Sequence, residues 1–244
     1  MRRLRVLTDG IVIAVIVLVG LLDLVVYTGI VQSDGSSSTR DATPIASPPP
    51  GAGAAGARLA EEDADDALPG RFVPTQGRQH TQAYPLRQHV PFCKDTSAPS
   101  NSCYASNPPT SGLHLPVERN ITLTDGNSID VPPNRGIYEF AIPREAIPHI
   151  EEHGGVYVGY NCDGGCGDAL DRSKAIVSQE LSLGARVVMS PDSDLDDGTI
   201  AAVSWTRIDS FDASDYSDQR LRNFIKAHNC RFDPEGFCKE PLRN

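Results

Sequence analysis

The sequence predicts an α+β fold class: a small β-rich exported domain with short helices, preceded by one transmembrane helix and a disordered tether. Three observations lead to this prediction. One long apolar run stands near the N-terminus, all six cysteines lie well after it, and the C-terminal half alternates short β-branched segments with Gly, Pro and Asp. Apolar residues make up 39% of the 244 residues, and 21 glycines add to them. This composition is in the globular range and excludes a wholly disordered chain.

Residues 11–31 form the predicted transmembrane helix. The run is apolar over 21 residues apart from Asp23 and a few small or weakly polar residues. A helix of this length crosses one bilayer core, and the run is too long for the apolar part of a signal peptide. Arginines at positions 2, 3 and 5 precede it, so the positive-inside rule places residues 1–10 in the cytoplasm. We therefore expect a single-pass cell-membrane protein with an extracytoplasmic C-terminal domain, in which Asp23 either contacts another helix or snorkels to the interface.

Residues 32–70 form the predicted linker, an acidic segment rich in Ala, Gly, Ser and Pro. These four types supply 24 of its 39 residues, and none of the 39 is aromatic. Such a segment cannot bury enough apolar surface to offset the entropy of ordering. Residues 71–244 remain for the extracytoplasmic domain, which is long enough to form a hydrophobic core. The chain's formal net charge of −10 repels phosphate backbones and excludes nucleic acid as a partner.

All six cysteines lie in the exported domain, where oxidising conditions allow disulfides to persist. Six cysteines allow fifteen pairings. Their arrangement in three close couples favours Cys93–Cys103, Cys162–Cys166 and Cys230–Cys238. The C-D-G-G-C loop at 162–166 also has the donors of a thiolate metal site or a redox loop, but it is neither a C-x-x-C nor repeated, so we interpret it as a structural disulfide.

The domain's regular structure is predicted to be short and mainly β. Strands are expected at 136–142, 155–160, 185–189 and 199–207, where β-branched and aromatic residues are bounded by turn residues. A short helix is expected before Gly154 and Gly155, which end it. A second helix is expected at 217–228, where Leu221, Phe224 and Ile225 recur at helical spacing.

The stretch H-I-E-E-H at 149–153 carries the densest set of chemically active side chains. Residues four apart on a helix point the same way, so His149 and His153 can offer two imidazoles to one ion, with Glu152 beside them. H-x-x-E-H is also the inverted zinc-peptidase signature. Pro148 and Gly154 leave little more than one helical turn around it, which argues against a peptidase but not against metal binding.

Two further histidines extend this set. His80 ends G-R-Q-H, and His114 follows P-P-T-S-G-L, a segment whose prolines and turn residues hold a side chain rigidly. His80, His114, His149 and His153 fit a tetrahedral site, or three of them fit an open one, with Glu152 as ligand, base or orienting group. Imidazole suits Zn²⁺ or Cu²⁺. The alternative is that each histidine separately hydrogen-bonds a loop to the sheet.

Other motifs are weaker. The Asp-rich stretch 192–198 is similar to a calcium loop, but Asp197 and Val203 stand where Gly and Glu are needed, so we interpret it as a solvated turn. No G-x-S-x-G elbow, P-loop or dinucleotide fingerprint occurs, which argues against hydrolase, kinase and dehydrogenase activity.

The chain resembles a family of bacterial membrane-anchored proteins that carry a domain of unknown function. The resemblance rests on G-x-x-H (77–80), P-P-T-S-G-x-H (108–114) and H-x-x-E-H-G (149–154), and it covers most of residues 71–236. Members usually have an aliphatic residue where Glu151 stands and W-G-R where this chain has W-T-R at 205–207, and they do not generally carry these cysteine couples. The resemblance implies the anchored topology and places the four histidines in the defining motifs. It brings no established activity.

We therefore expect a membrane-anchored, extracytoplasmic metal-binding protein rather than an enzyme. A different class remains open: a disulfide-stabilised interaction module of a cell-envelope complex, in which the histidines are structural and the domain has a protein partner. A zinc peptidase that uses H-x-x-E-H is the third and least favoured reading.

Overall fold

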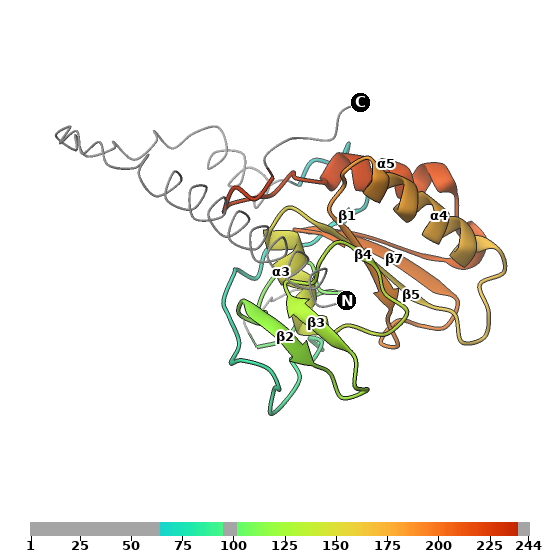
Figure 1. Ribbon diagram of the computed structural model, residues 1–244. Helices are drawn as coiled ribbons and strands as arrows, with labels where there is room; N and C mark the ends of the chain where they lie inside the picture. The colour runs from blue at the N-terminus through green and yellow to red at the C-terminus, as the bar shows by residue number, and fades with distance from the viewer. Residues whose placement is uncertain (1–63, 95–101, 239–244) are drawn as a thin grey trace, which may run out of the picture. The chain divides into compact units, whose positions relative to one another are not determined.

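The structure is a computed structural model and describes residues 64–94 and 102–238. The predicted transmembrane segment 11–31, with Asp23, and most of the predicted linker lie outside these residues. Among the residues that are described, no helix is both long and apolar enough to cross a membrane. The described part is a small mixed α+β domain built mainly on one β-sheet with short helices (Figure 1). The coarse fold class predicted from the sequence is therefore confirmed.

A six-stranded mixed sheet forms the centre of this domain. In spatial order its strands are β1 Arg71–Phe72, β8 Arg207–Asp212, β7 Thr199–Ser204, β5 Val156–Asn161, β6 Val187–Pro191 and β4 Gly136–Ile137. β6 pairs in parallel with β5 and β4, and the other neighbours are antiparallel. Five of the six residues of β5 are buried, as expected of a central strand that is covered on both faces.

Two helices cover one face of the sheet (Figure 1). α4, Ala169–Ser182, is the crossover between the parallel strands β5 and β6. α5, Asp218–His228, lies beside it and begins where the Ser217 hydroxyl accepts a hydrogen bond from the Arg220 N–H. Leu221, Phe224 and Ile225 of α5 pack with apolar residues of β5, β6 and β7 in one buried cluster.

The other face of the sheet supports the candidate site. It carries the short helix α3, Ile147–Glu152, and the separate hairpin of β2, Glu118–Thr122, and β3, Ser128–Val131 (Figure 1). A second buried cluster joins these elements to the sheet, with Ile121 from the hairpin, Ile147 from α3 and Tyr157 from β5. α3 is therefore fixed between the sheet and the hairpin.

The elements differ from the predicted ones in several places. The strand expected at 136–142 is formed only at 136–137, and the one expected at 199–207 ends at Ser204, where a turn with Thr206 at φ +63° leads into β8. The strands β1 and β8, the helix α4 and the β2–β3 hairpin were not predicted. The buried stripe of α4 includes Ser173 and Glu180, so its apolar periodicity is broken in the sequence.

The three disulfides confirm the predicted pairing of the close couples. Cys93–Cys103, Cys162–Cys166 and Cys230–Cys238 are bonded, and none of the six cysteines is free. The C-D-G-G-C loop is thus closed by a disulfide, as interpreted above. The last couple lies next to the end of α3, because the Cys230 N–H donates to the Gly154 carbonyl at 2.8 Å.

The last residues of the predicted linker are bonded to the domain. Arg207, whose side chain is buried, donates hydrogen bonds to the carbonyl oxygens of Asp65 and Gly70, and His228 donates to that of Pro69 at 2.8 Å. Ordered contacts with the sheet therefore begin a few residues before position 71.

Candidate metal centre

Two of the sequence motifs form a single structural unit. The segments 77–80 and 112–114 run side by side, because the Gly112 N–H donates to the Gly77 carbonyl at 2.9 Å and the His114 N–H donates to the Gln79 carbonyl at 3.0 Å. This parallel pairing sets His80 opposite His114. Gly112 has φ +104°, a conformation that L side chains rarely adopt. The glycine in P-P-T-S-G-x-H is therefore needed to bring the two histidines together.

The third motif places its histidines through α3. Pro148 lies in the first turn, where its missing N–H costs nothing. The helix ends at His153, and Gly154 continues the chain with φ +77°. The Leu115 N–H donates to the Glu145 carbonyl at 2.9 Å, which ties the segment after His114 to the turn before α3.

The hydrogen bonds of the two fully buried rings fix their tautomers. The Nδ1–H of His114 donates to the Gly112 carbonyl at 2.9 Å, and that of His149 donates to the Leu115 carbonyl at 2.7 Å. In the neutral form of each ring, this bond leaves the lone pair on Nε2. Backbone carbonyls in this position orient metal-binding histidines in many proteins. Burial lowers the pKa of His149 to about 4, since the bond to Leu115 offsets the loss of solvation only in part, so this ring is neutral at pH 7.

The predicted ligands lie in two overlapping groups that share His149. One is His80, His114 and His149, and the other is His149, Glu152 and His153, with one ligand atom from each residue within 4.8 Å of the others. Ring centroids are 4.7 Å apart for His80 and His114, and 5.0 Å apart for His114 and His149. His80 is exposed and the others are buried. Buried histidine groups that can hold a metal ion are thus present.

Glu152 connects the two groups. Its Oε2 lies 3.0 Å from Nε2 of His114, and its Oε1 lies 3.4 Å from the Arg78 guanidinium. Burial on its own would raise the pKa of Glu152, but His114 and Arg78 together bring it below its usual value. The carboxylate is therefore ionised at neutral pH.

His153 lies on the far side of His149, with ring centroids 4.6 Å apart. It stacks on Phe237 at 4.1 Å, and its Nε2 lies 3.3 Å from Oε2 of Glu235. Burial lowers its pKa. The four predicted histidines thus follow one another in a row, and His149 is the member common to both groups.

The remaining histidines and the Asp-rich stretch have other partners. His89 bonds Glu145 at 3.1 Å, and His228 bonds Pro69. In the stretch 192–198, Asp192 accepts from the Asp194 N–H and Asp197 accepts from the Gly164 N–H, while Asp194 forms an ion pair with Arg144. Three of its four carboxylates are thus occupied by the protein's own groups, in line with a structural turn.

Three partners of the site were missed from the sequence. Arg78, within G-R-Q-H, was not predicted, although its positive charge close to His80 in the sequence could have indicated it. Leu115 acts only through its backbone carbonyl, which no residue type reveals. Glu235 is far from α3 in sequence and reaches His153 because the Cys230–Cys238 loop returns to it.

Comparison with known families matches residues 96–240, more than half of the chain, to the family described as "Protein of unknown function (DUF3105)". His114, His149 and His153 lie within the matched residues, and His80 lies before them. No curated protein and no solved structure gives a significant match. The chain belongs to this family of proteins of unknown function.

Proposed function

We propose that this protein is a single-pass membrane-anchored protein whose extracytoplasmic domain binds one Zn²⁺ or Cu²⁺ ion through His80, His114 and His149, with Glu152 and His153 at the border of the site. The observation that supports this most is the shared orientation of the two buried rings. Both use Nδ1 on a backbone carbonyl and leave Nε2 for a ligand.

The spacing of the donor atoms supports the same conclusion. Tetrahedral Zn²⁺ with nitrogens at about 2.1 Å holds neighbouring ligand atoms roughly 3.3 Å apart. Nε2 of His114 and Oε2 of Glu152 are 3.0 Å apart, which is close to the spacing of two ligands of one ion. The ligand atoms of the three histidines all lie within 4.8 Å of one another, so their side chains need to close by at most about 1.5 Å to reach the spacing of a tetrahedral site.

The accessibility of the rings suits an exchangeable ion. His114 and His149 are almost completely buried, with 0% and 1% exposure, whereas His80 is exposed. An ion would therefore enter on the His80 side and meet a preformed pair of imidazoles behind it. The ionised Glu152 adds a negative charge that offsets the charge of the metal.

The test measures metal content in the full chain, purified in a nonionic detergent and stripped with a chelating resin. After loading with Zn²⁺ or Cu²⁺ and gel filtration, we expect about one equivalent by mass spectrometry. His80→Ala changes an exposed side chain and should retain the fold, yet weaken binding by about 100-fold or more, since even outer-shell changes cost 10- to 100-fold. His89→Ala, outside the cluster, is the matched control. Unchanged metal content in a variant with both His80→Ala and His149→Ala would overturn the proposal.

The same experiment separates the other two functions. Histidines that only pin loops predict a thermal unfolding midpoint that zinc does not change, together with a co-purifying envelope partner, and that result would favour the interaction module. A zinc peptidase requires Glu152→Gln to abolish peptide cleavage by the wild-type chain. Its structural support is weaker, because Glu152 is held by His114 and Arg78 and α3 has only six residues.

A further inference from the structure

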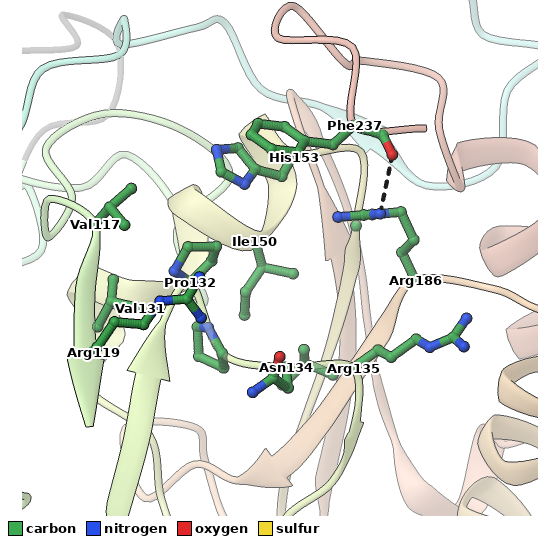
Figure 2. Close-up of a pocket in the computed structure, with 13 residues that line it drawn as sticks. Val117, Arg119, Val131, Pro132, Asn134, Arg135, Ile150, His153, Arg186 and Phe237 are labelled. Atoms are coloured by element: carbon green, nitrogen blue, oxygen red, sulfur yellow. Dashed lines mark hydrogen bonds between the residues drawn. The ribbon is translucent and has the colours of Figure 1, made fainter. Parts of the chain in front are cut away.

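A cavity of about 390 Å³ lies beside the histidine row (Figure 2). Its walls come from the β2–β3 hairpin and the segment after it, from α3 and from β6. Ile150 lies in the middle of the view, and His153 and Phe237 close one end. A volume of this size suits a small molecule, since ligand pockets usually measure about 300–1,000 Å³.

Three arginines line this cavity, although the chain as a whole is acidic. They are Arg119, Arg135 and Arg186. Arg119 is paired with Asp130 at 3.0 Å, whereas Arg186 donates to the Phe237 carbonyl at 3.3 Å and Arg135 donates to the Gly184 carbonyl at 3.2 Å.

Within the described residues, Arg135 and Arg186 have no carboxylate at ion-pair distance. The cavity therefore carries excess positive charge in a protein whose formal net charge is −10. This local positive charge attracts an anion.

Most of the rest of the lining is apolar. Val131, Ile150 and Val188 are 1%, 5% and 2% exposed. They belong to the cluster that fixes α3 and the hairpin to the sheet. Figure 2 shows Arg186 and Arg119 on opposite sides of Ile150, with Arg186 beneath Phe237. A ligand in this space meets cationic groups at the sides and hydrocarbon between them.

We propose that this cavity binds a small organic carboxylate with a short apolar body. A guanidinium presents its N–H donors in a planar fork that matches a carboxylate, which favours Arg186 as the main contact and Arg119 as the second. The apolar body packs on Ile150 and Val131. This assignment does not depend on the metal site, although His153 is common to both.

The test uses hexanoate and its neutral analogue hexanamide, which has nearly the same shape. Each is titrated calorimetrically into the full chain in nonionic detergent, after metal removal with a chelating resin and with detergent blanks subtracted. Hexanoate should bind with a Kd of about 1 mM or tighter. Hexanamide should bind at least about tenfold more weakly, because it loses the charge-assisted contact. Inorganic phosphate should also bind at least about tenfold more weakly, because it has no apolar body to make the apolar contact.

Variants separate the charge from the fold. Arg186→Gln should weaken hexanoate binding about tenfold or more, but it also releases Phe237. Arg119→Gln alters a side chain that is 80% exposed and leaves the fold intact, so a severalfold loss there reports the contact itself. Arg172→Gln on α4, paired with Asp168 and Asp218 away from the cavity, should bind like the wild type. Equal binding of hexanoate and hexanamide, no heat from hexanoate up to about 10 mM, or unchanged affinity in the Arg119→Gln, Arg186→Gln double variant would each overturn the proposal.

Discussion

Asp192, at the start of the turn between β6 and β7, makes the stability of the domain depend on pH. Its side chain is nearly buried, and this burial, together with the negative charge of Asp194, raises its pKa to about 6. The Asp194 N–H, Arg144 and the Tyr157 hydroxyl lower the pKa, but by less. We predict that Asp192→Asn stabilises the protein above pH 6, because asparagine keeps an oxygen for the Asp194 N–H and never ionises.

The size and sign of the effect follow from the two pKa values of Asp192. Below about pH 3 the carboxyl is protonated in both the folded and the unfolded state and does not affect stability. From the unfolded value of 3.8 to the folded value of about 6 the unfolded state ionises first, so the free energy of unfolding falls as pH rises. The loss reaches about 3 kcal/mol and is constant above pH 6.

The assay is urea unfolding of the full chain in nonionic detergent, followed by the fluorescence of Trp205. Trp205 is the only tryptophan of the chain, is 1% exposed and stacks on Phe232, so it reports this domain alone. Asp192→Asn should match the wild type near pH 3 and exceed it by about 2–3 kcal/mol at pH 7. Equal stabilities at pH 7, or a variant that is less stable there, would show that the carboxylate is favourably paired when folded and would refute the reasoning.

Two substitutions test the packing around the site and between the helices. Gly154→Ala should lower the free energy of unfolding by about 2 kcal/mol or more, because Gly154 has φ +77° and an added Cβ would lie 2.5 Å from Sγ of Cys238. Gly136→Ala is the control, since the new atom there has open space around it. Equal urea midpoints for the two variants would contradict this prediction. Arg222→Met should lower the free energy of unfolding by about 3 kcal/mol, because it leaves the fully buried Glu180 without its ion-pair partner. Adding Glu180→Met should restore most of that loss in the same assay. If the Arg222→Met variant is as stable as the wild type, the ion pair is dispensable.

The sequence predicted those elements whose packing is apolar and periodic. α5 was predicted because Leu221, Phe224 and Ile225 form a continuous buried stripe behind the Ser217 cap. α4 was not, since two of its five buried positions hold polar residues. Ser173 donates to the Ala169 carbonyl one turn earlier, whereas Glu180 is paired with Arg222, which is distant in sequence. Only the folded structure supplies that partner. This result explains why the longest helix of the domain carried a weaker signal than the shorter one.

The β2–β3 hairpin was not predicted either, but here a sequence pattern typical of a hairpin turn was present. Asp125 and Gly126 form a turn dipeptide between two β-branched segments, and the turn is closed by the Leu123 N–H on the Asn127 carbonyl at 2.8 Å. The irregular pairing between Glu118 and Ile121 interrupts the alternation of β2, which hides the strand from a pattern of period two.

In the candidate site, too, some features follow from local sequence and others follow from contacts between distant segments. The sequence predicted the ligand types and the i, i+4 pair on α3, because these depend on local spacing. It did not predict that 77–80 and 112–114 pair in parallel, which is what sets His80 against His114. Nor did it predict that His149 is common to two groups, a consequence of the hydrogen bond from its ring to Leu115. Backbone pairing between distant segments has no signature in residue type.

His153 gives the two proposed sites a physical relation. Its ring stands 4.6 Å from that of His149 on one side and stacks on Phe237, in the cavity wall, on the other. Phe237 is itself held near α3, since the Cys230–Cys238 bond and the Asp233 carboxylate fix its loop. An ion that recruited Nε2 of His153 would compete with Glu235, 3.3 Å from that nitrogen, and would add positive charge at the end of the cavity that His153, Phe237 and Arg186 line. If His80, His114 and His149 instead hold the ion alone, the cavity keeps its shape, and zinc should leave hexanoate affinity unchanged.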